Sequence, residues 1–294
     1  MVRIIGFFVG LFFAVMALWA FGTGLYNQIT SPPEKTAASV FHREPRALHL
    51  SSDGWLGDWR GQDNEQLQRG FQVYKEVCSA CHSLNHVAFR DLTEIGYSQA
   101  EVKAIAAGFM VPGVDPTTGE ANLRPGTPTD YFPKPFANDI AARAANHNAI
   151  PPDLSLITKA RDGGAAYVYS LITGFQPIPP ELKKQFPDFD TPPGLYFNPY
   201  FANLNLAMPP PLRSNGQVEY KDGTNPTVDQ MAKDVAAFLV WTAEPSLGKR
   251  HQTGFVVLGF LLFATVLAYL AKKQVWAENK QEFAVEESPR RKAA

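Results

Sequence analysis

Both cysteines of this 294-residue chain lie in one pentapeptide, Cys78-Ser79-Ala80-Cys81-His82. The C-x-x-C-H pattern is typical of a c-type haem attachment site, because each of the two thiols can form a thioether with a haem vinyl group. The histidine that follows is then placed to coordinate the iron. We therefore predict one covalently bound haem c, held by Cys78 and Cys81, with His82 as an iron ligand.

A C-x-x-C pair also occurs in thioredoxin-like redox sites and in zinc sites. A thioredoxin-like pair is found near a βαβ pattern, which is absent here, and a zinc site of this kind needs a second pair of ligands. Because the chain has only two cysteines, a structural disulfide elsewhere is excluded. Haem attachment is the interpretation that the motif favours.

The second axial ligand of such a haem is a methionine, a histidine or an open position. Met1 and Met16 fall in the N-terminal apolar segment, which leaves three methionines. Met208 precedes three consecutive prolines, which stiffen the chain and reduce the entropy that the sulfur would lose on binding iron. Met231 falls on the apolar face of a predicted helix, whereas Met110 lies in a predicted loop and stays a candidate.

Two histidines are alternatives by residue type. His86 follows His82 by only four residues, so it cannot easily reach the opposite face of the haem. His147 stays a competitor. The preference of electron-transfer haems for His/Met ligation favours Met208.

One amphipathic helix is predicted to carry the motif. Five positions at steps of four and three residues would share its buried face: Leu67, Phe71, Tyr74, Cys78 and Cys81. Asp63 and Gln66 can cap its start. Its other side would carry polar residues, namely Gln68, Arg69, Gln72 and Lys75.

Two further helices are predicted downstream. One is capped by Thr227 and Gln230, is stopped by Pro245, and has an apolar stripe of Val228, Met231, Val235, Phe238 and Leu239. A shorter one spans residues 163–174. Between residues 177 and 211 lie ten of the 24 prolines, so we expect irregular chain there, wrapped around the cofactor. The predicted fold is mainly α.

Two apolar runs are long enough for membrane helices. Residues 253–271 carry no charge and would span about 28 Å at 1.5 Å per residue, close to the thickness of a hydrocarbon core. We predict a C-terminal transmembrane helix at 249–273. Residues 1–26 form either a signal peptide or an N-terminal anchor; the missing small-residue cleavage site favours retention.

Charge supports a topology for these segments. Residues 27–248 carry 18 Lys and Arg against 24 Asp and Glu, whereas the two ends carry 9 basic and 4 acidic residues. Basic flanks stay in the cytoplasm under the positive-inside rule. We therefore expect a cytoplasmic tail at 274–294 and an acidic haem domain at 27–248 in the periplasm. An acidic surface would also steer a basic electron-transfer partner.

Several segments in order make the chain resemble the cytochrome c1 family, from about residue 66 to about residue 273. The matching segments are residues 69–83, 143–155, 196–200, 206–212, 231–235 and 241–245. The N-terminal run lacks the Arg- and Ser-rich presequence of a mitochondrial import signal, which favours a bacterial origin, and the resemblance is to the alphaproteobacterial type of the family. The resemblance implies a cytochrome c-type haem domain with long proline-rich loops between the two terminal helices.

The resemblance also implies residue roles. Cys78 and Cys81 match the thioether cysteines, His82 the proximal ligand and Met208 the axial methionine. Arg143 matches an arginine that pairs with a haem propionate.

Two further matches concern the wall of the haem pocket. Pro151 and Pro152 match the segment that walls the haem. The usual Asn-Asn-Gly reads Asn146-His147-Asn148 here, which makes His147 a solvent-facing variant rather than a ligand.

The function implied by the resemblance is that of the haem subunit of a cytochrome bc1 complex in a bacterial inner membrane. Such a subunit passes electrons from the Rieske iron–sulfur protein to cytochrome c during ubiquinol oxidation, with cytochrome b as a further partner. It performs no bond chemistry itself, and no nucleic-acid partner is expected. Two alternatives stay open: a membrane-tethered electron carrier outside any bc1 complex, and a haem enzyme or gas sensor with a labile sixth ligand.

Overall fold

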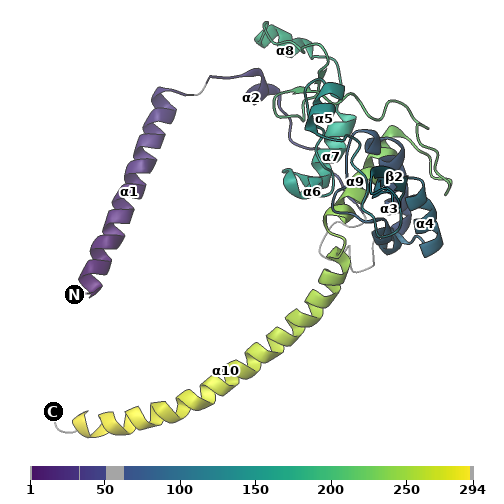
Figure 1. The fold of residues 1–294 in the computed structure, drawn as a ribbon. Helices are drawn as coiled ribbons and strands as arrows, with labels where there is room; N and C mark the ends of the chain where they lie inside the picture. The colour runs from purple at the N-terminus through teal and green to yellow at the C-terminus, as the bar shows by residue number, and fades with distance from the viewer. Residues whose placement is uncertain (1, 33, 51–62, 292–294) are drawn as a thin grey trace.

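The computed structural model describes residues 2–32, 34–50 and 63–291, and it is mainly α-helical, as predicted (Figure 1). A globular domain carries two long apolar helices that leave it. The helices of the described residues are α1 (Val2–Thr30), α2 (Ala37–Phe41), α3 (Asn64–Glu76), α4 (Gln99–Ala107), α5 (Asp139–Ala145), α6 (Ile157–Ala160), α7 (Gly164–Thr173), α8 (Pro180–Gln185), α9 (Val228–Ala243) and α10 (Leu247–Arg291), with 3-10 turns η2 (Cys78–Ala80) and η3 (Phe89–Ile95).

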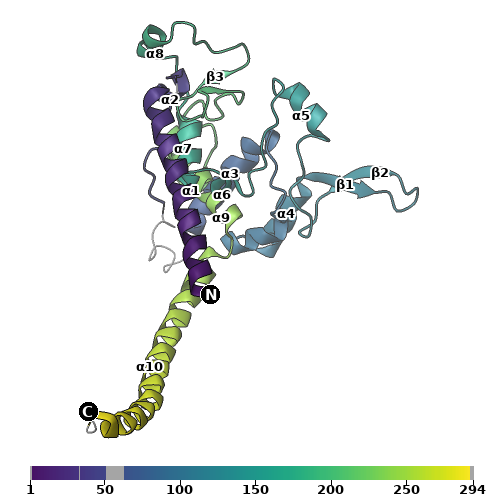
Figure 2. The same ribbon diagram turned by 90° about the vertical axis from the view of Figure 1, so that its left-hand side faces the viewer.

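Strands are few and short. In the described parts of the chain, β1 (Met110–Val114) pairs antiparallel with β2 (Ala121–Pro125), and β3 (Tyr196–Phe197) pairs antiparallel with β4 (Asn205–Leu206). The β1–β2 hairpin was not predicted. It projects from the side of the globular domain (Figure 2).

Helix α3 leads into the cysteine motif but does not contain it. Its start is capped as predicted, since the Asp63 carboxylate accepts a hydrogen bond from the Gln66 N–H. The helix ends at Glu76, and the next residue, Val77, has a φ of −119°. The Ser79 hydroxyl donates a hydrogen bond to the Lys75 carbonyl. The chain then tightens into the turn η2. The prediction that both cysteines continue the buried helical face is therefore wrong.

The core forms where α3 crosses α9. Gly70 permits the close approach, because a Cβ there would lie 2.0 Å from the Asp234 carbonyl oxygen. Around the crossing, aromatic rings pack edge to face or tilted: Phe71, Tyr74, Phe89, Phe109, Phe132, Phe238 and Trp241. Met231 is fully buried in this core, as predicted from its helix face. Helix α9 starts with the predicted Thr227 cap and ends just before Pro245.

The proline-rich stretch is largely irregular, as predicted, but it contains one short helix and the two-residue strands β3 and β4. Helix α8 begins at Pro180, a position where proline costs no hydrogen bond, since the first amide of a helix has no intrahelical partner. Helix α7 coincides with the helix predicted between two glycines, Gly163 and Gly174.

Two helices are long and apolar enough to cross a membrane, Val2–Thr30 and Leu247–Ala277. None of α1 is buried against the domain. Helix α10 continues without a break to Arg291, beyond the predicted end of the span at residue 273. The outer ends of α1 and α10 lie on the same side of the globular domain in both views (Figures 1 and 2).

Candidate haem site

The two cysteines lie at different depths. Cys78 packs against the main core, and burial, with a smaller contribution from the charge of Cys81, raises the pKa of its thiol to about 12. Cys81 is exposed. Within the described ranges, no three His, Cys, Asp or Glu side chains converge to hold a metal ion. Among these residues, none forms with Cys78 and Cys81 the four-ligand set that a structural zinc site needs.

His82 is held by its backbone and by its ring. The His82 N–H donates to the Cys78 carbonyl over 2.9 Å, and the Tyr74 hydroxyl donates to the His82 carbonyl over 3.1 Å. The ring Nδ1 lies 2.8 Å from the Pro152 carbonyl oxygen. A carbonyl only accepts, so Nδ1 carries the proton and Nε2 keeps its lone pair for a metal. Burial lowers the pKa of His82, which favours this neutral ring.

The segment that follows Pro152 is fastened to the residues after His82. The Asp153 carboxylate accepts hydrogen bonds from the Ser83 hydroxyl and the Asn85 N–H, both over 2.8 Å. Burial raises the pKa of Asp153, but these bonds and those from Ser155 outweigh it and hold the pKa below its ordinary range. The His86 N–H donates to the buried Ser155 hydroxyl. The Pro152 carbonyl is thereby kept within reach of the His82 ring.

The methionine and histidine candidates occupy different environments. Met208 is half-buried on the irregular segment just after β4 and before the three prolines. Met110 is 50% exposed at the start of β1. His86 is exposed, and so is His147, whose backbone has a positive φ of 49° and whose ring lies close to Gly194.

Arg143 lies near the C-terminal end of α5 and is exposed. Its Nη1 donates to the Asn148 carbonyl over 2.9 Å and so closes the turn after the helix. Asn148 has φ 64°, in the left-handed region that asparagine tolerates better than most residues. This bond uses one of the five N–H donors of the guanidinium, so the group can also pair with an anion.

The donor chemistry of these residues fits a c-type haem. Two thiols with the attachment spacing stand directly before an imidazole whose Nε2 is available to iron. A thioether on a proline-stiffened segment supplies the other kind of ligand found in electron-transfer haems. Next to Pro151, Ile150 exposes apolar surface of the type that contacts a porphyrin.

Comparison with known proteins agrees with this chemistry. The model of the cytochrome C1 family matches residues 51–279. The chain belongs to the cytochrome c1 family. Members of this family bind haem and form the haem subunit of the bc1 complex, which is ubiquinol–cytochrome c reductase.

Relatives within the cytochrome c1 family come from bacteria and from mitochondria. The chain is 44% identical over 243 residues to cytochrome c1 of Rhodospirillum rubrum, which covers 80% of this chain and 89% of the relative. It is 39% identical over 280 residues to the mitochondrial cytochrome c1 haem protein of Kluyveromyces lactis, covering 95% and 91%. It is 45% identical over 232 residues to a protein of Bradyrhizobium diazoefficiens named cytochrome b/c1, covering 74% of this chain and 34% of that longer protein.

Sequence reasoning missed one residue of this site, Asp153, and one role of a residue that it had named, Pro152. It assigned Pro152 to the wall of the pocket, whereas the structure also uses its carbonyl to fix the His82 tautomer. It assigned no role to Asp153, which fastens the two segments together. A carboxylate followed two residues later by serine is a common turn signal, but its partner 70 residues away in sequence is set by the fold.

Proposed function

We propose that this chain carries electrons through one covalently attached haem c, from a Rieske iron–sulfur protein to a cytochrome c, during ubiquinol oxidation. The observation that carries the proposal is the His82 ring, whose Nδ1–H is committed to the Pro152 carbonyl and whose Nε2 is left for iron. A histidine oriented by a second hydrogen bond is the usual form of a histidine that binds a metal.

Each of the other site residues has a part in the proposal. Cys78 and Cys81 would hold the haem through two thioethers, and the Met208 sulfur would join His82 as a ligand of its iron. Held by these residues, the haem would supply reversible one-electron exchange. The chain therefore performs no bond chemistry on a substrate.

Arg143, Pro151 and Pro152 shape the surroundings of the haem in this proposal. The guanidinium of Arg143, already fixed by Asn148, pairs with a propionate and favours its ionised form. Pro151 and Pro152 form a rigid wall, since proline restricts the backbone on both sides of the peptide bond.

The proposed location is a bacterial inner membrane, with the haem domain in the periplasm and the tail of α10 in the cytoplasm. Two apolar helices and the basic residues at both ends support this orientation. Cytochrome b is the proposed membrane partner. A relative named cytochrome b/c1 and another, from Candida albicans, named cytochrome b-c1 complex catalytic subunit support the partnership.

The test is purification of the chain from membranes of its host through a tag after Ala294, with redox difference spectra and subunit masses recorded on the same sample. The proposal expects a c-type spectrum, b-type haem in the same complex, and ubiquinol–cytochrome c reductase activity. A c-type spectrum without cytochrome b would instead indicate a tethered electron carrier. Rapid binding of CO to the reduced protein would indicate a labile sixth ligand and a haem enzyme or sensor.

A Cys81→Ser variant tests the attachment itself. Loss of one thioether should lower the amount of haem that stays with the chain after denaturing electrophoresis. Ser79→Ala is a matched control, since it changes a residue inside the motif without removing a thiol. Because the Cys78 thioether alone can still retain haem, the α band of the reduced pyridine haemochrome is recorded as well; a band at the wild-type wavelength in Cys81→Ser, with no restored vinyl group, would contradict attachment through this cysteine.

A further inference from the structure

The chain that follows Met208 forms a strap, residues 208–224, without regular secondary structure. Its first half is closed by one side-chain amide. Gln217 Nε2 donates to the Pro211 carbonyl over 2.8 Å, and its Oε1 accepts from the Arg213 N–H over 2.8 Å. Val218, just beyond, is fully buried in the main core. The strap is therefore a defined structure and not a loose connection.

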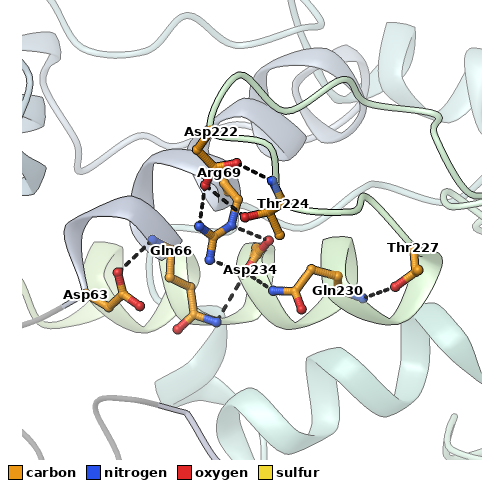
Figure 3. A network of polar contacts seen from close by, with 8 residues as sticks. All are labelled: Asp63, Gln66, Arg69, Asp222, Thr224, Thr227, Gln230 and Asp234. Atoms are coloured by element: carbon orange, nitrogen blue, oxygen red, sulfur yellow. Dashed lines mark hydrogen bonds and ion pairs between the residues drawn. The ribbon is translucent and has the colours of Figure 1, made fainter.

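Two side chains of α3 hold the second half of the strap. Gln72 Nε2 donates to the Glu219 carbonyl over 2.7 Å. Arg69 Nη1 donates to the Asp222 carboxylate, also over 2.7 Å. The same carboxylate accepts from the Thr224 N–H over 2.9 Å, which orients it toward Arg69 (Figure 3).

The Arg69 guanidinium, which binds Asp222 of the strap, is also held by a residue of α9. Arg69 Nε donates to Asp234 of α9 over 3.0 Å, and the Asp234 side chain is completely buried. Gln66 of α3 and Gln230 of α9 donate to the same carboxylate, so Asp234 accepts hydrogen bonds from three side chains (Figure 3). A charge at this depth is tolerated because it is paired and hydrogen-bonded. Arg69 thus presents an immobile donor to Asp222.

Helix α3 therefore holds two segments at once. Its C-terminal end leads into Cys78 and His82, and the Tyr74 hydroxyl contacts the His82 carbonyl. Its polar side, which carries Arg69 and Gln72, holds the strap. One helix thereby connects the segment of the proximal histidine with the segment of Met208.

We propose that Gln72 and Asp222 are positioning residues for the Met208 sulfur, because they fasten the strap to the helix that leads into the attachment motif. This inference rests on the proposed function, in which Met208 is the second axial ligand. Without these two contacts the strap loses its hydrogen bonds to α3, and near Asp222 it keeps the Tyr220 ring, whose centroid lies 5.9 Å from the Arg69 guanidinium, and the buried Val218. The sulfur then leaves the iron more often, although neither residue touches the haem.

The experiment compares Gln72→Ala, Asp222→Ala and the double variant in the full-length, haem-loaded protein. Gln68→Ala is the matched control, since Gln68 lies on the same helix and donates Nε2 to the Ile95 carbonyl over 3.0 Å, outside the strap. Three properties are measured: the long-wavelength charge-transfer band of methionine-ligated ferric haem, the rate of CO binding to the reduced haem, and the urea midpoint.

Loss of one such hydrogen bond should raise the population of sulfur-detached haem about fivefold, and the CO rate by the same factor. The double variant should bind CO faster than either single variant and show a weaker charge-transfer band. Gln68→Ala should lower the urea midpoint yet bind CO at the wild-type rate. If Gln72→Ala and Asp222→Ala also bind CO at that rate, the contacts serve stability alone and the inference is wrong.

Met208→Leu separates this failure from a failure of the proposed function. If the Met208→Leu protein keeps the charge-transfer band and the slow rate of CO binding, Met208 is not an iron ligand. The proposed function is then wrong at this residue, and so is the positioning role inferred from it. If Met208→Leu loses the band while the Gln72 and Asp222 variants keep it, only the positioning role is refuted. Should Asp222→Ala not accumulate with haem, Asp222→Asn keeps the bond from Thr224 and weakens only the ion pair.

Discussion

At the scale of single residues, the site depends on a backbone carbonyl as much as on side chains. The Pro152 carbonyl selects Nδ1 as the protonated nitrogen of His82, which leaves the lone pair of Nε2 for the iron ligation that we propose. Any residue at position 152 has a carbonyl, so the side chain of proline is not what makes the bond. Its fixed φ, together with the Asp153 hydrogen bonds, keeps the carbonyl in place.

Met208→Leu should lower the reduction potential by an amount on the order of 0.3 V and open the reduced iron to CO, because methionine ligation raises the potential within the roughly 0.8 V that axial ligands span. Redox titration of the purified protein measures the change. Met110→Leu is the control, since Met110 is a methionine half-exposed on β1. If the reduction potential shifts in Met110→Leu and not in Met208→Leu, Met110 and not Met208 is the methionine ligand.

Asp130 should give part of the stability of the domain a pH dependence. Hydrogen bonds from Arg124 and then from Thr127 hold the pKa of Asp130 well below its ordinary value of 3.8. A depressed pKa stabilises the folded state above the ordinary value, and this contribution is lost as the pH falls through the folded value. Asp130→Asn should therefore cost about 1 kcal/mol at neutral pH and progressively less below pH 3.8.

Urea unfolding at several pH values measures this difference. Arg124→Met should produce a similar loss, because both changes remove the same two-pronged ion pair. A stability difference between wild type and Asp130→Asn that stays constant down to the lowest pH would show that the carboxylate charge contributes nothing.

At the scale of elements, the crossing of α3 and α9 positions the site. Helix α3 brings the motif to the core, and its ending at Glu76 lets the motif turn outward so that Cys81 is exposed. Helix α9 supplies the surface on which α3 rests. The crossing is close because position 70 has no side chain.

Gly70→Ala should destabilise the haem domain by about 3 kcal/mol, although alanine is the better helix former by about 1 kcal/mol. The added Cβ would lie 2.0 Å from a backbone oxygen and 2.6 Å from the Phe238 Cβ, so α3 and α9 must separate. The urea midpoint and the yield of haem-loaded protein report the effect. Gly108→Ala is the control, because its Cβ meets no atom closer than 3.3 Å; equal midpoints would contradict close packing at Gly70.

At the scale of the whole molecule, ion pairs join the globular domain to the membrane helix. Glu244, at the end of α9, pairs with Lys159 of α6 and with Arg250 of α10. Lys249 of α10 lies 3.7 Å from Glu94. Burial raises the pKa of Glu244, but the two cations outweigh this and lower it. The start of α10 is thus tied to the domain by several charges.

The segment after α1 also belongs to the globular domain. The Arg43 N–H donates to the Pro199 carbonyl over 2.8 Å, and the Arg46 guanidinium lies over the rings of Tyr169 and Tyr200 at 4.8 and 5.5 Å. Removal of α1 would leave these contacts intact only if cleavage falls before them. A mature chain that begins before Arg43 would keep these contacts.

Reporter fusions test the topology. A reporter after Ala294 should be cytoplasmic and one after Ala243 periplasmic, because basic residues flank both spans. N-terminal sequencing then distinguishes a retained anchor, starting at Met1 or Val2, from a signal peptide cleaved between residues 21 and 33. We expect retention, since no small-residue cleavage site is evident. A start beyond residue 43 would contradict the packing of this segment.

The sequence by itself determined the kind of cofactor chemistry and the main helices. The C-x-x-C-H spacing, the caps at Asp63 and Thr227 and the apolar runs are local patterns, and each is set by residues within a few positions of one another. Such patterns can be recognised in the sequence because helix capping, apolar periodicity and the spacing of the two cysteines do not depend on the rest of the chain.

The tertiary structure alone decided which distant groups meet. The Pro152 carbonyl lies 70 residues from His82, and Asp222 lies 153 residues from Arg69, yet each pair is in hydrogen-bond contact. The end of α3 before the cysteines was likewise not predicted, because the apolar periodicity of the sequence continues past Glu76, where the helix ends. Arg69 is itself held by Asp234 of α9, a third distant segment, and no spacing within one segment encodes such a long-range pairing.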